Sequence, residues 1–180
     1  VAINGKNIGL MAVEEHFSKE LLESQGHRES VIIKFNEYLV HEEANGANGI
    51  FPITSSFKNV DIQAFGIKNI MRSKTLSTQL EISRGLIRGF QTGGILASDV
   101  FDPEIMGRFL ALSHLWGAWH ALQWHNIRFY FNPITTKLEP IGYDAEIREY
   151  IWNQGFNNFP AGYPLASDLL SDEKILDSYK

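Results

Sequence analysis

The sequence predicts a single α+β domain, and three observations carry that prediction. Residues 31–35 form a short β-branched run with the character of a strand. Two further strand-like runs, 127–131 and 138–141, flank a turn and predict a hairpin. Two long segments, 73–91 and 103–122, repeat their apolar residues every three or four positions, as amphipathic helices do. With 180 residues, 44% of them hydrophobic and 21% charged, the chain can bury one sizeable core.

The N-terminal part, residues 1–69, is expected to be rich in sheet. Its first 15 residues predict a hairpin, in which the turn Asn4-Gly5-Lys6-Asn7 joins an apolar start to a second strand over 8–13, because Asn-Gly tolerates the positive φ angles that tight hairpins need. Residues 15–24 contain many helix formers, and Gly26 follows where a helix would end. Residues 41–59 carry clustered Gly, Asn, Pro and Ser and predict a loop, at which we expect an insertion.

The C-terminal part, residues 70–180, is expected to be helical apart from one hairpin over 126–144. Ser73 or Ser77 is placed to cap the helix over 73–91, and two glycines follow that helix.

The helix over 103–122 has the clearest start signal in the chain. Asp102 is an N-cap residue and Pro103 fits the first helical position. The tail over 150–180 is rich in Gly, Pro and Asn and predicts irregular coil, with a short helix near 167–178.

Composition excludes several classes of function. The net charge is −5 and no long basic run occurs, so we expect no nucleic-acid partner. The absence of Cys excludes disulfides and thiolate chemistry. No apolar run reaches the roughly 18 residues that span a bilayer, so no membrane span is predicted. Because the chain starts with Val1 inside a strand-like segment, we expect a piece of a longer protein, and the compartment stays undetermined.

Polar residues interrupt the apolar pattern in an order typical of phosphoryl transfer of the kinase type. Lys34 lies in a strand, a long helix follows, Asn126 lies in a short loop, and Asp144 comes just after a hairpin. A strand Lys can hold nucleotide phosphates, and Mg²⁺ prefers hard oxygen ligands such as a carboxylate and an amide. Taken singly, Lys34 also suits an exposed edge strand, and Asp144 suits a helix cap.

Three histidines suggest a rival zinc site. His120 and His125, together with Asp144, could serve a zinc hydrolase, and His114 lies nearby in sequence. Their spacings of six and five residues do not place two ligands on one helix face, unlike the HExxH pattern. A His beside Trp119 or Trp124 more simply predicts a packed, hydrogen-bonded side chain.

Three motifs in order resemble the spore-coat protein CotH kinase family. Residues 4–15 are similar to its NGxxxGxYxxxE hairpin, with Met11 at the Tyr position, and 31–34 to its next strand. Residues 125–130 and 139–145 are similar to its HN-x-x-x-Y and PI-x-x-D ending. The likeness covers 1–35 and 115–147.

The resemblance implies a protein-kinase-like fold that binds ATP with Mg²⁺ or Mn²⁺ and phosphorylates protein Ser or another hydroxyl acceptor. It implies that Lys34 contacts phosphates, that Glu15 supports Lys34, and that Asn126 and Asp144 ligate the metal. Glu81, on the following helix, is a rival partner for Lys34. A bacterial cell-surface or spore-coat location is implied as well.

The sequence departs from the family at the catalytic base. An Asp is expected about five residues before Asn126, but Ala121 stands there. His120 and His125 are the candidate bases, because a neutral imidazole accepts protons near neutral pH. The alternative is an inactive kinase-like module that binds a partner in a coat or surface through aromatic residues of its tail. Those aromatic residues are Trp152, Phe156, Phe159 and Tyr163.

Overall fold

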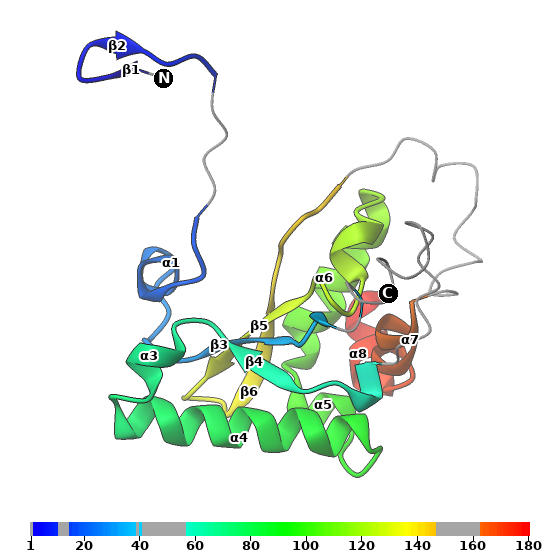
Figure 1. The fold of residues 1–180 in the computed structure, drawn as a ribbon. Coiled ribbons are helices and arrows are strands. Elements are labelled where there is room, and N and C mark those ends of the chain that lie inside the picture. The colour runs from blue at the N-terminus through cyan, green and yellow to red at the C-terminus, as the bar shows by residue number, and fades with distance from the viewer. Residues whose placement is uncertain (1, 11–14, 39, 41–56, 147–162) are drawn as a thin grey trace.

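The computed structural model describes residues 2–10, 15–38, 40, 57–146 and 163–180, and it confirms the predicted α+β class. Two antiparallel sheets are present in this part of the chain. The smaller is a hairpin of β1 (Ala2–Ile3) and β2 (Lys6–Asn7), whose turn has positive φ at Asn4 and Gly5; Lys6 and Asn7, predicted in the turn, form the second strand instead. In Figure 1 this hairpin stands apart from the rest of the described chain.

The larger sheet has four strands in the order β4-β3-β5-β6. These strands are β4 (Ile62–Ala64), β3 (Ile32–Phe35), β5 (Arg128–Asn132) and β6 (Lys137–Ile141). All neighbours are antiparallel, and β3 pairs directly with β5. The predicted sheet-rich and helical parts therefore share one sheet.

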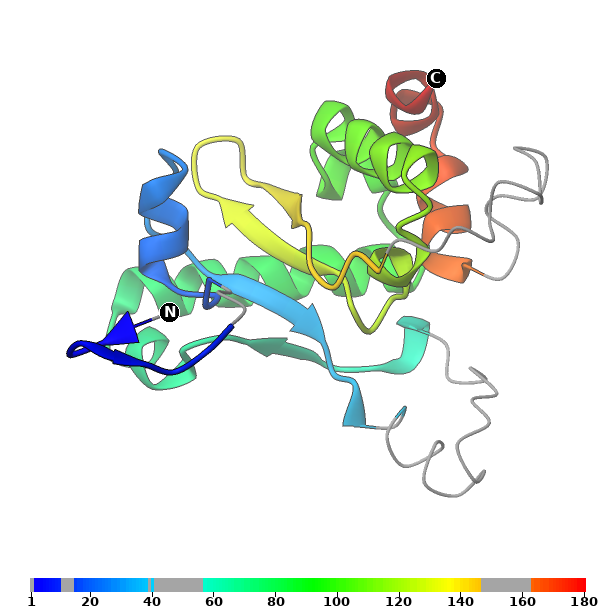
Figure 2. The same cartoon turned by 90° about the horizontal axis from the view of Figure 1, so that it is seen from above.

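Strand alternation gives this sheet two different faces. Ile33 and Phe129 belong to the main core, which contains buried residues of six α-helices. These helices are α3 (Ile67–Ile70), α4 (Lys74–Gln91), α5 (Ala97–Val100), α6 (Pro103–Leu115), α7 (Pro164–Leu170) and α8 (Glu173–Tyr179). The other face carries Ile32 and Tyr130, which pack with α1 (Lys19–Ser24) in a smaller cluster. Figures 1 and 2 show α1 and α4 on different sides of the sheet.

The predicted helix over 73–91 is confirmed as α4. The Ser73 hydroxyl accepts a hydrogen bond from the Leu76 N–H at 3.3 Å, so Ser73 rather than Ser77 is the cap. The residues of α4 that are buried lie on one side and contact the main core, as the apolar periodicity predicts.

The helix predicted over 103–122 begins as expected but ends early. The Asp102 carboxylate accepts from the N–H groups of Glu104 and Ile105 at 3.1 and 3.0 Å. The helix stops at Leu115 because Gly117 adopts a positive φ of 63° and the chain closes a Schellman motif. A short 3₁₀ turn, η2 (Trp119–Leu122), then replaces the predicted last helical turn.

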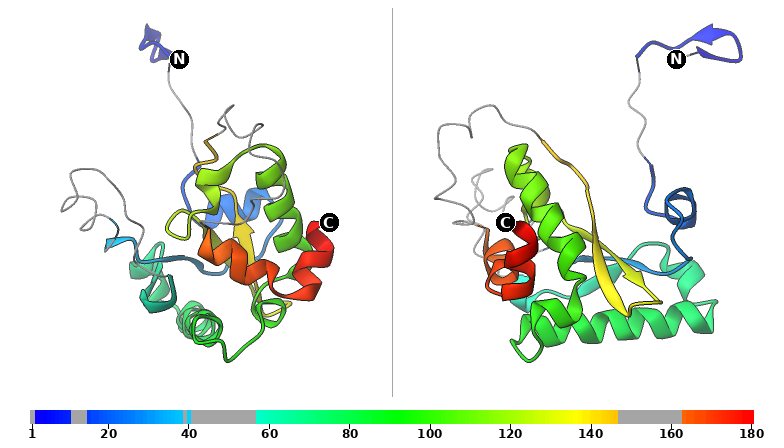
Figure 3. Two further views of the ribbon diagram at one scale, coloured as in Figure 1. Left: turned by 90° about the vertical axis from the view of Figure 1, so that its right-hand side faces the viewer. Right: turned by 180° about the vertical axis from the view of Figure 1, so that it is seen from behind.

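One prediction of irregular chain was wrong. The loop predicted over 41–59 falls mostly on 41–56, which lie outside the described residues; its end forms η1 (Phe57–Asn59), and β4 and α3 (Ile67–Ile70) follow it. In the tail, where coil and one short helix were predicted, 150–162 also lie outside the described residues, and the rest forms the two helices α7 and α8. Tertiary packing explains this difference, because Leu169 is buried in the main core. Figure 3 shows α8 lying alongside α6.

Candidate functional site

His120, Asn126 and Asp144 form a polar cluster where the β5–β6 hairpin opens. In an antiparallel pair, residues just before the first strand lie beside residues just after the second, and Arg128 pairs with Ile141 here. The hairpin therefore brings Asn126 and Asp144 together although 18 residues separate them. The Asn126 Nδ2 atom lies 3.5 Å from the Asp144 Oδ2 atom, and His120 Nδ1 lies 3.0 Å from that same oxygen.

The Asn126 side chain is held in place by the turn before it. Its Nδ2 donates to the His120 carbonyl oxygen at 3.1 Å and lies 3.0 Å from His120 Nδ1. The residue is buried, whereas about half of the Asp144 side chain is exposed. A carboxylate and an amide side by side are the hard donors that Mg²⁺ uses beside phosphate and water oxygens. The amide would have to turn to present its oxygen, since its nitrogen faces Asp144 here.

The zinc interpretation is not supported by this geometry. In the part of the chain that the structure describes, no group of three or more His, Asp or Glu side chains is placed to hold a metal ion. His120 lies against Asp144, but the His125 ring packs edge-on against Trp124, with 5.5 Å between ring centroids. The predicted trio of His120, His125 and Asp144 is therefore not assembled.

Lys34 lies on the sheet face that α1 covers, and its carboxylate partner is Glu37. The Lys34 ammonium makes an ion pair with Glu37 Oε1, and only 17% of the Lys34 side chain is exposed. Its ammonium also lies 5.7 Å from the centroid of the Phe65 ring. Glu37 follows the strand by only two residues, and no sequence pattern singled it out.

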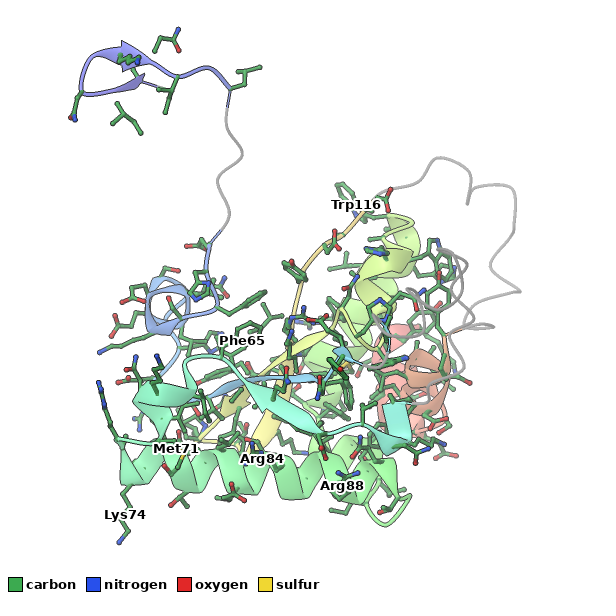
Figure 4. The ribbon with its side chains drawn as sticks, viewed as in Figure 1. Phe65, Met71, Lys74, Arg84, Arg88 and Trp116 are labelled. Atoms are coloured by element: carbon green, nitrogen blue, oxygen red, sulfur yellow. The ribbon has the colours of Figure 1, made fainter. Side chains whose placement is uncertain are left out.

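Glu81 does not reach Lys34. It pairs with Arg84 at 3.0 Å on the outer side of α4, with 71% of its side chain exposed. The physical reason is strand alternation, because α4 packs against the Ile33 face while Lys34 points to the opposite face. In Figure 4, Arg84, the partner of Glu81, lies on α4, and Phe65, whose ring the Lys34 ammonium approaches, lies away from that helix.

Two adjoining pockets connect Lys34 with Asp144. The first, of about 380 Å³, is lined by Lys34, Glu37 and Arg128 among others, and the second, of about 530 Å³, reaches Asp144. Glu15 and Tyr143 line both pockets. The predicted residues Lys34, Glu15 and Asp144 thus line neighbouring pockets, and the Asn126 amide lies 3.5 Å from the Asp144 carboxylate.

Arg128 is the main site residue that the sequence analysis missed. It is the cross-strand partner of Lys34 and only 5% of its side chain is exposed. Its Nη1 donates to the His125 carbonyl oxygen at 2.7 Å, and its guanidinium lies 4.8 Å from the centroid of the Tyr143 ring. Burial lowers the pKa of Arg128, while the charge of Glu37 opposes that shift. Strand alternation placed Arg128 on the Tyr130 face, but only pairing with β3 puts it beside Lys34.

His114 is a packed histidine. Its Nδ1 is hydrogen bonded to the Tyr179 hydroxyl, and its ring lies 5.1 Å from that of Trp119. Burial lowers the pKa of His114. The residue therefore links the end of α6 to α8 and takes no part in the site.

Acidification is expected to destabilise the protein through His114. Because the folded pKa lies below the unfolded value of about 6.5, the unfolded chain binds the proton more readily. The contribution of neutral His114 to the free energy of unfolding is complete at pH values above the unfolded pKa. It is lost as the pH falls below that pKa. Urea unfolding at pH 7.5 and 5.5 measures the effect, and His114→Gln should show a smaller loss of unfolding free energy between these pH values. An equal loss in the variant would contradict the assignment.

Comparison with known proteins identifies no relative of this chain. No family model, curated protein or solved structure matches the chain. None of the described helices combines the length and the apolar character needed to cross a membrane. The site is therefore interpreted from its own residues.

Proposed function

We propose that this chain is an ATP- and divalent-metal-binding domain of the atypical kinase type, as its resemblance to the CotH kinase family implies. One observation carries the proposal. Lys34, Asn126 and Asp144 come from three separate segments, and they lie on or beside two adjoining pockets. This supports Lys34, Asn126 and Asp144 as parts of one site, because the pocket that Lys34 lines and the pocket that Asp144 lines share Glu15 and Tyr143.

Each residue has a role that its surroundings support. Asp144 and Asn126 would hold Mg²⁺ or Mn²⁺, and the ion would neutralise charge on the nucleotide phosphates. Lys34 is oriented by Glu37 and would contact the phosphates. Glu15 lines both pockets, so its carboxylate is in a position to act on Lys34 and on the metal ion.

The proposed reaction is phosphoryl transfer to a protein Ser or another hydroxyl acceptor. The acceptor oxygen forms the new bond to phosphorus, the bond to the leaving ADP breaks, and the hydroxyl proton passes to a base. His120 is our choice of base rather than His125. Its ring lies 3.0 Å from Asp144, while the His125 ring packs on Trp124.

Calorimetric titration with ATP and Mn²⁺ tests the binding site. We expect the wild type to bind and Asp144→Ala to lose at least about tenfold in affinity, as removal of a metal carboxylate should cause. Glu81→Gln is the matched control, because it removes one exposed carboxylate far from the pockets. Equal heats for the wild type and Asp144→Ala would rule out the site.

A further inference from the structure

Lys34 and Arg128 place two positive charges side by side on one face of the sheet. They are register partners on β3 and β5, so their side chains leave the sheet in the same direction. Both line the pocket of about 380 Å³, together with Phe65 and Tyr143. Two like charges at adjacent cross-strand positions repel each other unless an anion lies between them.

The charge of Arg128 is poorly compensated for a buried group. Its guanidinium lies among three aromatic rings, and among the described residues its carboxylate partner is Glu37, whose Oε2 atom is 3.9 Å from Nη2. Its Nε atom is buried and has no hydrogen-bond partner among the described residues. Buried charges are ordinarily paired closely and fully hydrogen bonded. Arg128 is therefore short of a close anion.

Glu37 supplies the anion that the two cations share. One carboxylate oxygen meets Lys34, and the other faces Arg128 at the longer distance. Glu37 lies after the end of β3, and 26% of its side chain is exposed at the pocket. Its carboxylate thus occupies the place that an external anion would take between the two cations.

We propose that this pocket binds a phosphate group between Lys34 and Arg128, in the place of the Glu37 carboxylate. A phosphate offers three acceptor oxygens, and a planar guanidinium can pair with two of them at once. The inference extends the proposed function, because it names Arg128 as a second phosphate-binding residue and Glu37 as an internal competitor. The phosphate can belong to a nucleotide or be free.

Inorganic pyrophosphate without metal ion is the probe that tests this pocket. Glu37→Gln should bind pyrophosphate at least about tenfold more tightly than the wild type, because a negative charge within about 4 Å is removed. Glu81→Gln removes the same charge from the exposed side of α4 and should leave the affinity unchanged. If Glu37 served only to orient Lys34, its removal would weaken binding, and that result would overturn the proposal.

A second variant tests Arg128 without deleting its charge. Arg128→Lys keeps a cation in the pocket but loses the planar fork, so pyrophosphate affinity should fall. Circular dichroism confirms that the variant folds, and wild-type affinity in a folded Arg128→Lys would overturn the role of Arg128. If Arg128→Lys does not fold, the Glu37→Gln result alone decides the proposal.

The outcome separates this inference from the proposed function. If Glu37→Gln binds pyrophosphate more tightly but the protein does not bind ATP with Mn²⁺, the proposal of an anion pocket stands and the proposal of a nucleotide site is rejected. If ATP and Mn²⁺ bind in a way that depends on Asp144, but Glu37→Gln does not raise the affinity for pyrophosphate, the nucleotide site stands and the proposed competition by Glu37 is rejected.

Discussion

Replacement of His120 by Gln is expected to lower phosphoryl transfer by about 10²–10⁴-fold, the usual contribution of a positioned base. Gln is similar in size and keeps hydrogen-bonding capacity, but it cannot accept a proton near neutral pH. Nucleotide binding should survive, since Asn126 is held by the backbone carbonyl of residue 120, which the substitution leaves in place. Transfer of labelled phosphate from ATP to a hydroxyl acceptor, measured beside calorimetry, separates the two effects.

The same assay distinguishes the remaining interpretations. Wild-type turnover in His120→Gln would contradict the role of His120. If the wild type binds ATP with Mn²⁺ but transfers no phosphate, the chain is an inactive kinase-like module, consistent with Ala121 at the position where the family carries Asp. His125→Ala is a useful comparison, because the sequence named both histidines and the structure places only His120 against Asp144.

Replacement of Gly107 by Ala is expected to lower the free energy of unfolding by about 1–3 kcal/mol, the usual cost of overpacking. Gly107 lies in α6 where α8 crosses closely. A Cβ atom there would come within 2.5 Å of Ser178 Cβ and 2.8 Å of the Ile175 carbonyl oxygen. Because backbone atoms of α8 are in the way, the two helices would have to separate. Urea denaturation measures the loss.

Gly85→Ala is the matched control for that substitution. Gly85 lies in the middle of α4, and a Cβ atom there meets nothing within 4 Å. The same chemical change should raise the unfolding free energy by about 0.5–1 kcal/mol, because Ala favours the helix over Gly. Equal effects at the two positions would show that the close approach of α6 and α8 is not as described.

Much of the local structure could be read from the sequence. Asn4-Gly5 fixes the first turn, Ser73 begins α4, and Asp102 with Pro103 begins α6. These features depend on neighbouring residues alone, so a sequence pattern is enough to reveal them. The end of α6 was missed because Trp116 and Ala118 continue the helical composition, although Gly117 provides the positive φ that ends the helix.

The candidate site was only partly predictable. Lys34, Asn126 and Asp144 stood out as polar exceptions in apolar surroundings, and the β5–β6 hairpin explains why the last two meet. Glu37 and Arg128 did not stand out, because a carboxylate after a strand and an arginine inside one are both common on surfaces. Their importance depends on which strands pair and in which register.

By itself the sequence determined the fold class, the helix starts, the hairpins and the polar residues that can carry chemistry. It did so because capping, turn conformation and apolar periodicity act over a few residues. Only the tertiary structure decided that β3 pairs with β5, that α4 covers the face opposite Lys34, and that Lys34 therefore meets Glu37 and Arg128 instead of Glu81. Strand order and register arise from burial across distant segments, and a one-residue change of register would move every side chain of a strand to the other face.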